Sequence, residues 1–219
     1  PYTTLFRSMM SPIKVIERKD FAKYVELPCL EACLYLYDMN LHPYSSGCNK
    51  VNYDNAHIMI YYDDLSIENQ EVAEELVKKG YGMITTYNDE KFLTIAIKTS
   101  LDDDVKKVSD NLLSVVKDFV YQDVLYGFMT KEEFIKENIE ISLIFRYTDG
   151  ELIPNFPGDF DEEEIEDKKR EVLFDANESL ENAIDEGRVD LENDIVWENK
   201  ELFDKHIDYL DKKKGIGGK

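Results

Sequence analysis

The stretch AHIMIYYDDLSIENQEVAEELVKKGYGMITTYNDEKFLTIAIKTS, residues 56–100, has the clearest succession of strand and helix patterns in the chain. Residues 56–62 form a short apolar run that is typical of a strand, and residues 66–80 place apolar side chains at helical spacing. Residues 82–87 and 91–98 indicate two more strands, separated by a short polar turn. The stretch therefore predicts the order β-α-β-β, with a hairpin between the last two strands.

A second helix and a closing strand extend this pattern. Residues 100–119 carry apolar side chains on one stripe, and Ser100 with Asp103 resembles a capping box at the start of that helix. Residues 123–129 are predicted to form the closing strand. The order over residues 56–129 is then β-α-β-β-α-β, which matches a ferredoxin-like split βαβ arrangement. We therefore predict an α+β fold with a ferredoxin-like core, in which two helices cover one face of an antiparallel sheet.

Further elements are predicted on both sides of this core. Residues 27–40 indicate a helix, in which Pro28 suits the first turn. Its apolar stripe is expected to consist of Leu30, Leu34, Tyr37 and Leu41. After the core, Thr130 and Glu133 form the sequence signature of a capping box, and residues 139–147 then predict a strand.

Acidic residues are concentrated in the C-terminal part of the chain. The formal net charge of the 219 residues is −21, and residues 151–201 hold 19 acids and 5 bases, a net of −14. We therefore expect residues 10–150 to form the α+β domain and residues 151–219 to form an acidic appendage of helices and a hairpin. Residues 1–8 resemble a translated cloning adapter, so we expect them to be a non-native leader.

The charge balance argues against several classes of partner. Nucleic-acid backbones and anionic membrane surfaces attract clusters of lysine and arginine, so we expect direct contact with neither. No apolar run approaches the roughly 18–20 residues that span a bilayer. Three cysteines without a disulfide-framework pattern indicate a reducing, cytoplasmic compartment. The electrostatically favoured partner is a basic protein.

The segment CLEACLYLYDMNLHPYSSGC, residues 29–48, holds all three cysteines. Cys29 and Cys33 share one face of the predicted helix, and His42 and Cys48 could complete a tetrahedral metal site with them. Structural zinc sites usually present their cysteines on tight turns instead, and free cysteine packs as a small hydrophobe. We therefore interpret Cys29 and Cys33 as core residues, and keep a metal site and a redox or nucleophilic role as the weaker alternatives.

A second weak candidate for a metal site follows the first strand of the predicted core. Asp63 and Asp64 come directly after it, and Asp102–Asp104 occupy the equivalent place before the second helix. Such paired carboxylates can bind Mg²⁺, although acids in a first helical turn also complement the helix dipole. The chain contains no Ser-His-Asp, H-E-x-x-H or G-x-S-x-G pattern. We therefore predict no catalytic residue and no cofactor.

These observations favour a non-enzymatic interaction protein that binds a basic protein surface, in its sharpest form as a mimic of nucleic acid or an inhibitor. The alternatives are a small-molecule-binding regulatory module of ferredoxin-like type and a Mg-dependent enzyme that uses paired carboxylates. A homo-oligomer stays open. The predicted partner-binding residues are Asp161, Glu162, Glu163, Glu164, Glu166 and Trp197.

Overall fold

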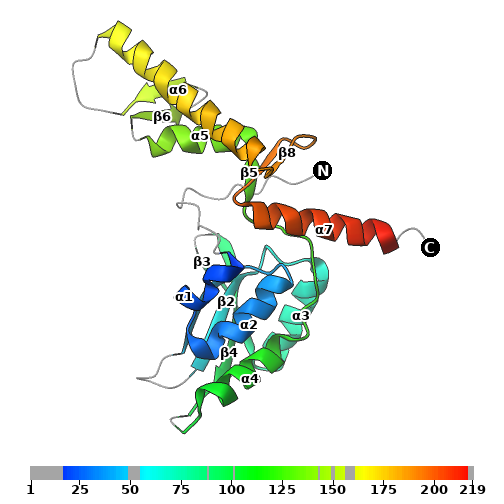
Figure 1. Ribbon diagram of the computed structural model, residues 1–219. Coiled ribbons are helices and arrows are strands. Elements are labelled where there is room, and N and C mark those ends of the chain that lie inside the picture. Colours follow the sequence, from blue (N-terminus) through cyan, green and yellow to red (C-terminus); the bar gives the residue numbers. More distant parts are fainter. Residues whose placement is uncertain are drawn as a thin grey trace. The chain divides into compact units, whose positions relative to one another are not determined.

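The structure is a computed structural model, which describes residues 17–48, 55–87, 89–100, 102–142, 144–148, 151–155 and 161–216. Helices and strands alternate irregularly along the chain (Figure 1). The helices are η1 (Arg18–Asp20), α1 (Phe21–Tyr24), α2 (Leu27–Asp38), α3 (Ile67–Lys78), α4 (Val105–Val116), α5 (Lys131–Ile141), α6 (Glu162–Asp185) and α7 (Lys200–Ile216). The strands are β1 (Pro43–Cys48), β2 (Asn55–Tyr61), β3 (Gly82–Tyr87), β4 (Glu90–Lys98), β5 (Phe128–Thr130), β6 (Phe145–Thr148), β7 (Glu151–Pro154), β8 (Val189–Asp190) and β9 (Ile195–Trp197).

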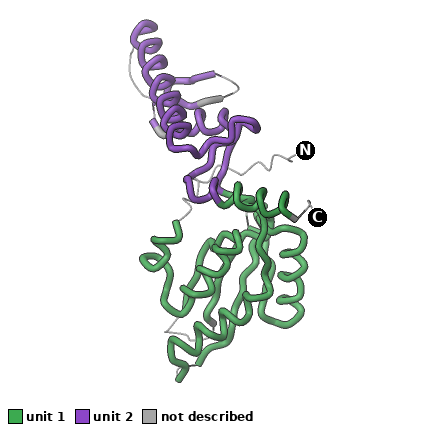
Figure 2. The backbone as a smooth tube through the Cα atoms, turned by 45° about the vertical axis from the view of Figure 1, so that its right-hand side comes forward, with its two compact units in different colours: residues 1–126, 205–219 green, residues 127–204 purple. Residues whose placement is uncertain are grey.

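The chain divides into two compact units (Figure 2). Unit 1 consists of Pro1–Tyr126 and Lys205–Lys219, and unit 2 of Gly127–Asp204. The domain boundary expected after residue 150 falls inside unit 2, between β6 and β7. The division into an α+β domain of residues 10–150 and an acidic appendage of residues 151–219 stays a prediction. The leader expected at residues 1–8 lies outside the described residues.

Unit 1 is built on a four-stranded antiparallel sheet with the order β1-β2-β4-β3. Ile58 lies opposite Ile95 and Ile60 opposite Leu93, and all four side chains are fully buried. The helices α2 and α4 pack against each other and against β2. This antiparallel sheet with its helices confirms the α+β class predicted from residues 56–129.

The prediction that residues 123–129 form the closing strand of this sheet is wrong. Residues 121–125 form no regular structure, and β5 pairs with β9 in unit 2. The place beside β2 is taken by β1, a segment of proline, serine and glycine that carries little strand signal. The backbone of Val120 bonds to a side chain instead. The side-chain amide of Asn69 donates to the carbonyl oxygen of Val120 at 2.9 Å, and its oxygen accepts from the amide of Val120 at 2.9 Å. The ferredoxin-like order of elements is therefore not the one observed.

Local capping signals are confirmed where a single side chain decides them. Ser66 accepts from the amide of Asn69, and Thr130 with Glu133 forms the predicted capping box. The start of α4 is different, because Asp104, not Ser100, accepts from the amide of Lys107 at 2.7 Å.

Unit 2 contains the two-stranded sheet β6-β7, the three-stranded sheet β5-β9-β8 and the helices α5 and α6. The strand expected over residues 139–147 begins only at Phe145, because α5 continues to Ile141. The core between α5, α6 and the β6-β7 hairpin consists of Ile139, Phe145, Val172 and Ala176, with Ile135, Ile144, Leu152 and Ile165 packed against it.

Candidate functional site

The cysteines of α2 lie in the core of unit 1. Cys29 and Cys33 are fully buried, and the Cys29 thiol lies 3.7 Å from the carbonyl oxygen of His57, to which it donates. Burial raises the pKa of both thiols to about 12, so both are protonated at neutral pH. A nucleophilic or metal-binding cysteine needs an accessible thiolate, which neither position supplies. The buried stripe of α2 runs through these two residues, whereas the predicted Leu30 and Leu34 are only half-buried.

Asp64 and Asp103 have structural partners. Asp64 accepts through its backbone carbonyl from Gln122, and Asp63 is exposed in the same turn. In the second turn, Asp103 accepts from the amide of Ser100 and pairs with Lys107. Within the described ranges, no three histidine, cysteine, aspartate or glutamate side chains gather to hold a metal ion. A magnesium site at Asp63 and Asp64 therefore gains no further ligand from this part of the chain.

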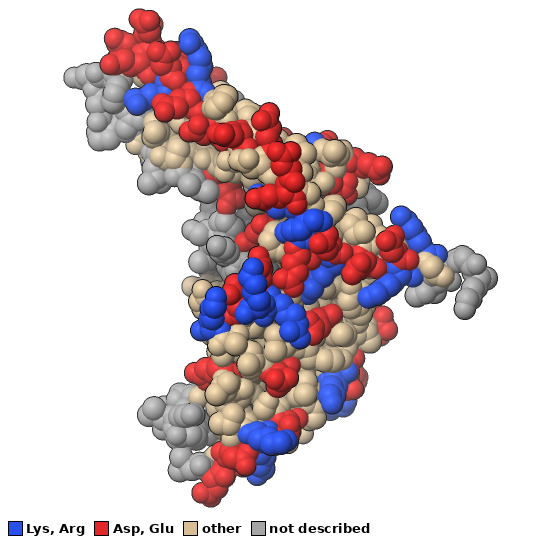
Figure 3. Space-filling model, viewed as in Figure 1, with Lys and Arg blue, Asp and Glu red and all other residues tan. Residues whose placement is uncertain are grey.

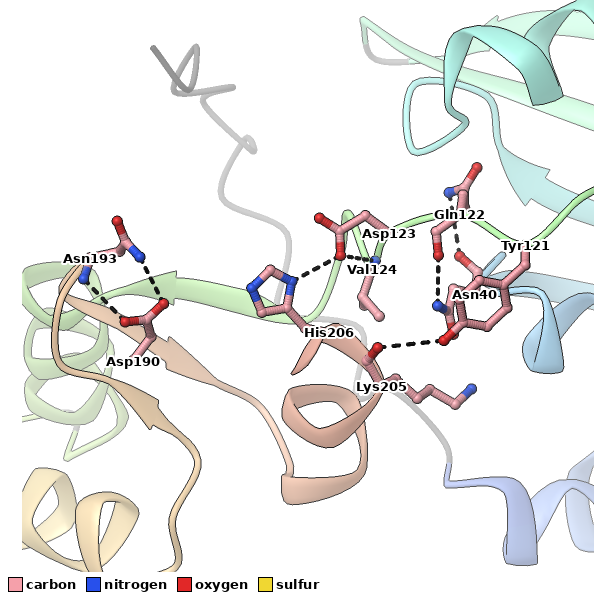
Figure 4. Close-up of polar contacts among 9 residues, drawn as sticks. All are labelled: Asn40, Tyr121, Gln122, Asp123, Val124, Asp190, Asn193, Lys205 and His206. Atoms are coloured by element: carbon pink, nitrogen blue, oxygen red, sulfur yellow. Dashed lines mark hydrogen bonds and ion pairs between the residues drawn. The ribbon is translucent and has the colours of Figure 1, made fainter. Parts of the chain in front are cut away.

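The part of α7 that belongs to unit 1 is attached by a cluster of polar and ring contacts (Figure 4). The imidazole Nδ1 of His206 lies 2.8 Å from a carboxylate oxygen of Asp123. The Lys205 ammonium donates to the carbonyl oxygen of Tyr37 at 2.7 Å and lies 3.4 Å from the centroid of that ring. Two helical turns further along, Lys212 lies 4.1 Å from the ring centroid of Tyr121. All these contacts position the helix, so we assign the cluster a structural role.

The acids predicted to bind a partner lie at the start of α6. Asp161 is the N-cap and forms a reciprocal capping box with Glu164, and Glu166 lies 3.5 Å from the ammonium of Lys169. Glu162 and Glu163 are exposed in the first turn, where carboxylates stabilise the helix through its dipole. Each of these five acids therefore has a local structural reason to be there. Their role in binding stays a prediction.

Trp197, which was predicted to bind a partner, is buried in the structure. Its side chain is 2% exposed in β9 and packs against Phe128, with the ring centroids 4.9 Å apart. A buried indole cannot be a contact residue unless the sheet opens, so we remove Trp197 from the candidate surface.

A different set of acids forms an exposed charged surface on α6. These five residues follow one another at intervals of three or four along α6 as far as its last residue, and we call them the α6 ridge: Glu171, Asp175, Glu178, Glu181 and Asp185. All five side chains are exposed. Residues 171–187 contain no lysine or arginine, and none lies within ion-pair distance of the ridge among the described residues. Figure 3 shows acidic side chains gathered along α6.

An exposed aromatic side chain lies beside the ridge. Phe174 is 69% exposed, three residues after Glu171 and four before Glu178. Residues at these spacings lie next to one another on a helix surface. The side chain therefore offers apolar contact area within a row of negative charge, a combination that suits a basic surface with an apolar depression.

The acids of the α6 ridge do not stabilise the helix that carries them. Like charges three or four residues apart disfavour a helix by about 0.2–0.5 kcal/mol for each pair. Four successive pairs of this kind occur between Glu171 and Asp185. Sequence inspection favoured the dense run at 161–166 and missed these acids, because they are spread over fifteen residues. Helical spacing was the signal that could have found them, once the helix was known to extend to Asp185.

Comparisons with known proteins give no family for this chain, since no family model, curated protein or solved structure matches it. Among the described residues, no helix is both long enough and apolar enough to cross a membrane.

Proposed function

We propose that this chain is a non-enzymatic interaction protein whose α6 ridge, with Phe174, binds a basic surface of a partner protein. The observation that carries the proposal is the uncompensated ridge, which lowers helix stability and has no partner among the described residues. The distribution of charge supports it, because unit 2 has a net charge of −17 and unit 1 of −4. Association with a basic partner would be fast and sensitive to salt.

The spacing of the charges along the α6 ridge favours binding to a basic protein over mimicry of duplex nucleic acid. With a rise of about 1.5 Å per residue, the five acids extend over roughly 21 Å, or one charge per about 5 Å. Duplex DNA carries one charge per about 1.7 Å of its axis. A groove built for DNA would therefore meet too few charges on this helix. We therefore propose a basic protein as the partner, and mimicry of nucleic acid stays a prediction.

Two further predictions from the sequence, the fold type of unit 1 and the cellular compartment, accompany this proposal. We propose that unit 1 is a rearranged relative of the ferredoxin-like fold, because β1 occupies the position beside β2 that the closing strand was expected to take. We also propose a cytoplasmic location, which the three free cysteines support. The metabolite-binding and magnesium-dependent alternatives stay predictions.

The test compares two full-length variants that lose the same charge. The ridge variant carries Glu171→Gln, Asp175→Asn, Glu178→Gln, Glu181→Gln and Asp185→Asn. The matched control neutralises five other exposed acids of unit 2: Glu132, Glu151 and Glu192, each to Gln, and Asp167 and Asp204, each to Asn. Each protein is used as bait in lysate at about 50 and about 500 mM salt, where exposed charges are weakly and strongly screened. Retained proteins are identified, and their affinity is remeasured with purified material.

We expect a basic protein that binds the native chain and the control variant, is released at high salt, and binds the ridge variant at least about tenfold more weakly. Phe174→Ala alone should weaken the same complex while leaving its salt dependence unchanged. Equal losses for the two five-residue variants would mean that net charge, not the ridge, drives capture. Retention by the ridge variant at native affinity would refute the proposal.

A further inference from the structure

The strand β3 is an open edge of the sheet in unit 1. It ends the strand order β1-β2-β4-β3, and β4 is the only strand that pairs with it among the described residues. The amide of Ala96 donates to the carbonyl of Tyr81 at 2.8 Å, which fixes the alternation along the strand. Every second residue from Tyr81 therefore bonds to β4, whereas Gly82, Ile84 and Thr86 direct their backbone groups away from it.

The opposite edge of the same sheet is protected and β3 is not. On β1, Pro43 lacks an amide hydrogen, the pairing is irregular between Pro43 and Ser45, and a Glu26 carboxylate oxygen accepts from the amide of Cys48 at 2.6 Å. Proline, bulges and charges are the usual devices that prevent edge strands from pairing. The strand GMITTY contains no proline and no charged residue. It also exposes Met83 at 56% and Tyr87 at 66%.

The composition of β3 suits pairing with a second copy of itself. In an antiparallel arrangement centred on Ile84, Gly82 lies opposite Thr86 of the second copy, and Met83 lies opposite its Thr85. Tyr81 then faces Tyr87 of the second copy, and aromatic cross-strand pairs stabilise sheets. No charged side chain of the strand meets its own equivalent.

The ends of the strand carry opposite charges, which selects the antiparallel direction. Lys78 and Lys79 precede β3, whereas Asp89 and Glu90 follow it. Antiparallel pairing brings the basic end of one copy to the acidic end of the other, and parallel pairing would bring like charges together. Unit 1 carries a net charge of only −4, so the general repulsion between two such sheets is small.

We propose that β3 pairs with β3 of a second copy of this chain, around a twofold axis at Ile84, and joins two four-stranded sheets into one. The pairing adds about six hydrogen bonds between the strands. It uses no residue of the α6 ridge, so this proposal and the proposed function stand or fall separately.

Two cysteine variants test the register of the pairing. In the full chain with Cys48→Ser, the variant Ile84→Cys places two thiols opposite each other across the axis. The Cα atoms of such a pair are about 5.5 Å apart, which suits a disulfide. The matched control Thr86→Cys places its thiols about 13 Å apart, at about 3.3 Å per residue over four positions. We expect a disulfide-linked dimer of Ile84→Cys under mild oxidation and none of Thr86→Cys.

Sedimentation of the native full chain over a range of concentrations tests the dimer itself. Thr86→Pro removes an amide that points away from β4, so the fold is retained while the dimer weakens at least about tenfold. Ile67→Lys, at an exposed position of α3, is the control and should leave the dimer unchanged. A chain that is monomeric throughout, a dimer insensitive to Thr86→Pro, or equal crosslinking of the two cysteine variants would overturn the proposal.

Discussion

Gln122 joins three separate segments of unit 1 through a single side chain. Its amide oxygen accepts from the amide of Ser66 at 2.8 Å and from the side chain of Asn69 at 2.7 Å. Its amide nitrogen donates to the carbonyls of Asp64 at 2.7 Å and Asn40 at 3.3 Å. These bonds attach the segment after α4 to the ends of α2 and α3, so the segment needs no place in the sheet.

Replacement of Gln122 should therefore be costly. Gln122→Ala leaves several buried donors and acceptors without a partner, and we expect the free energy of unfolding to fall by about 2–4 kcal/mol. Gln70→Ala is the matched control, because Gln70 donates one bond, to the carbonyl of Leu65 at 3.1 Å, and its loss should cost about 1 kcal/mol. Urea unfolding followed by circular dichroism measures both. Equal losses would show that the network contributes no more than a single bond.

At the scale of the element, α5 contains a carboxyl group in an unfavourable environment. Burial, and then repulsion from Glu140, raise the pKa of Glu137 above its ordinary value of 4.5. The folded state therefore holds this proton more tightly than the unfolded state does. Stability from this group is complete below pH 4.5 and is lost as the pH rises through the raised pKa.

We accordingly expect Glu137→Gln to make unit 2 more stable than the native chain at pH 7, and to give no such gain near pH 4. The control Glu192→Gln, at an exposed position in the β8-β9 turn, should leave stability unchanged at both values. Thermal unfolding at the two pH values measures the difference. A gain of equal size at both would contradict the assigned cause, since it would not depend on ionisation.

The helices and strands also show which features of this chain can be predicted from its sequence. The helices α2 and α3 and the strands β2 to β4 followed from local periodicity, and the caps at Ser66 and Thr130 from single side chains. The strand β1 was missed because its sequence, PYSSGC, has little strand propensity, and its pairing is decided by β2. The opposite error at residues 123–129 arose because apolar side chains such as Val124 and Tyr126 are buried without any strand pairing. The α6 ridge could be identified only after the length of the helix was known.

At the scale of the whole molecule, charge is divided unequally between the units. Unit 2 carries a net charge of −17 in 78 residues, and self-repulsion of this kind destabilises a compact state. Trp197 is the only tryptophan of the chain and is buried in unit 2, so its fluorescence reports the unfolding of that unit alone.

We expect the thermal midpoint seen by Trp197 to rise between about 50 and about 500 mM NaCl, because added salt screens the repulsion. The ridge variant and its charge-matched control should both show a smaller rise, and by similar amounts, since repulsion within the unit depends on net charge. In partner binding, by contrast, only the ridge variant is expected to differ. A midpoint independent of salt would show that the acids of unit 2 are already well separated by solvent.

The division of unit 1 into Pro1–Tyr126 and Lys205–Lys219 has a consequence for its biosynthesis. The four strands and the helices around them leave the ribosome first, but the segment that carries Lys205 and His206 follows only after the 78 residues of unit 2. At about 5–20 residues per second, that delay is roughly 4–16 s. During this interval the sheet of unit 1 lacks α7, so the contacts of Asp123 with His206 and of Tyr37 with Lys205 cannot yet form.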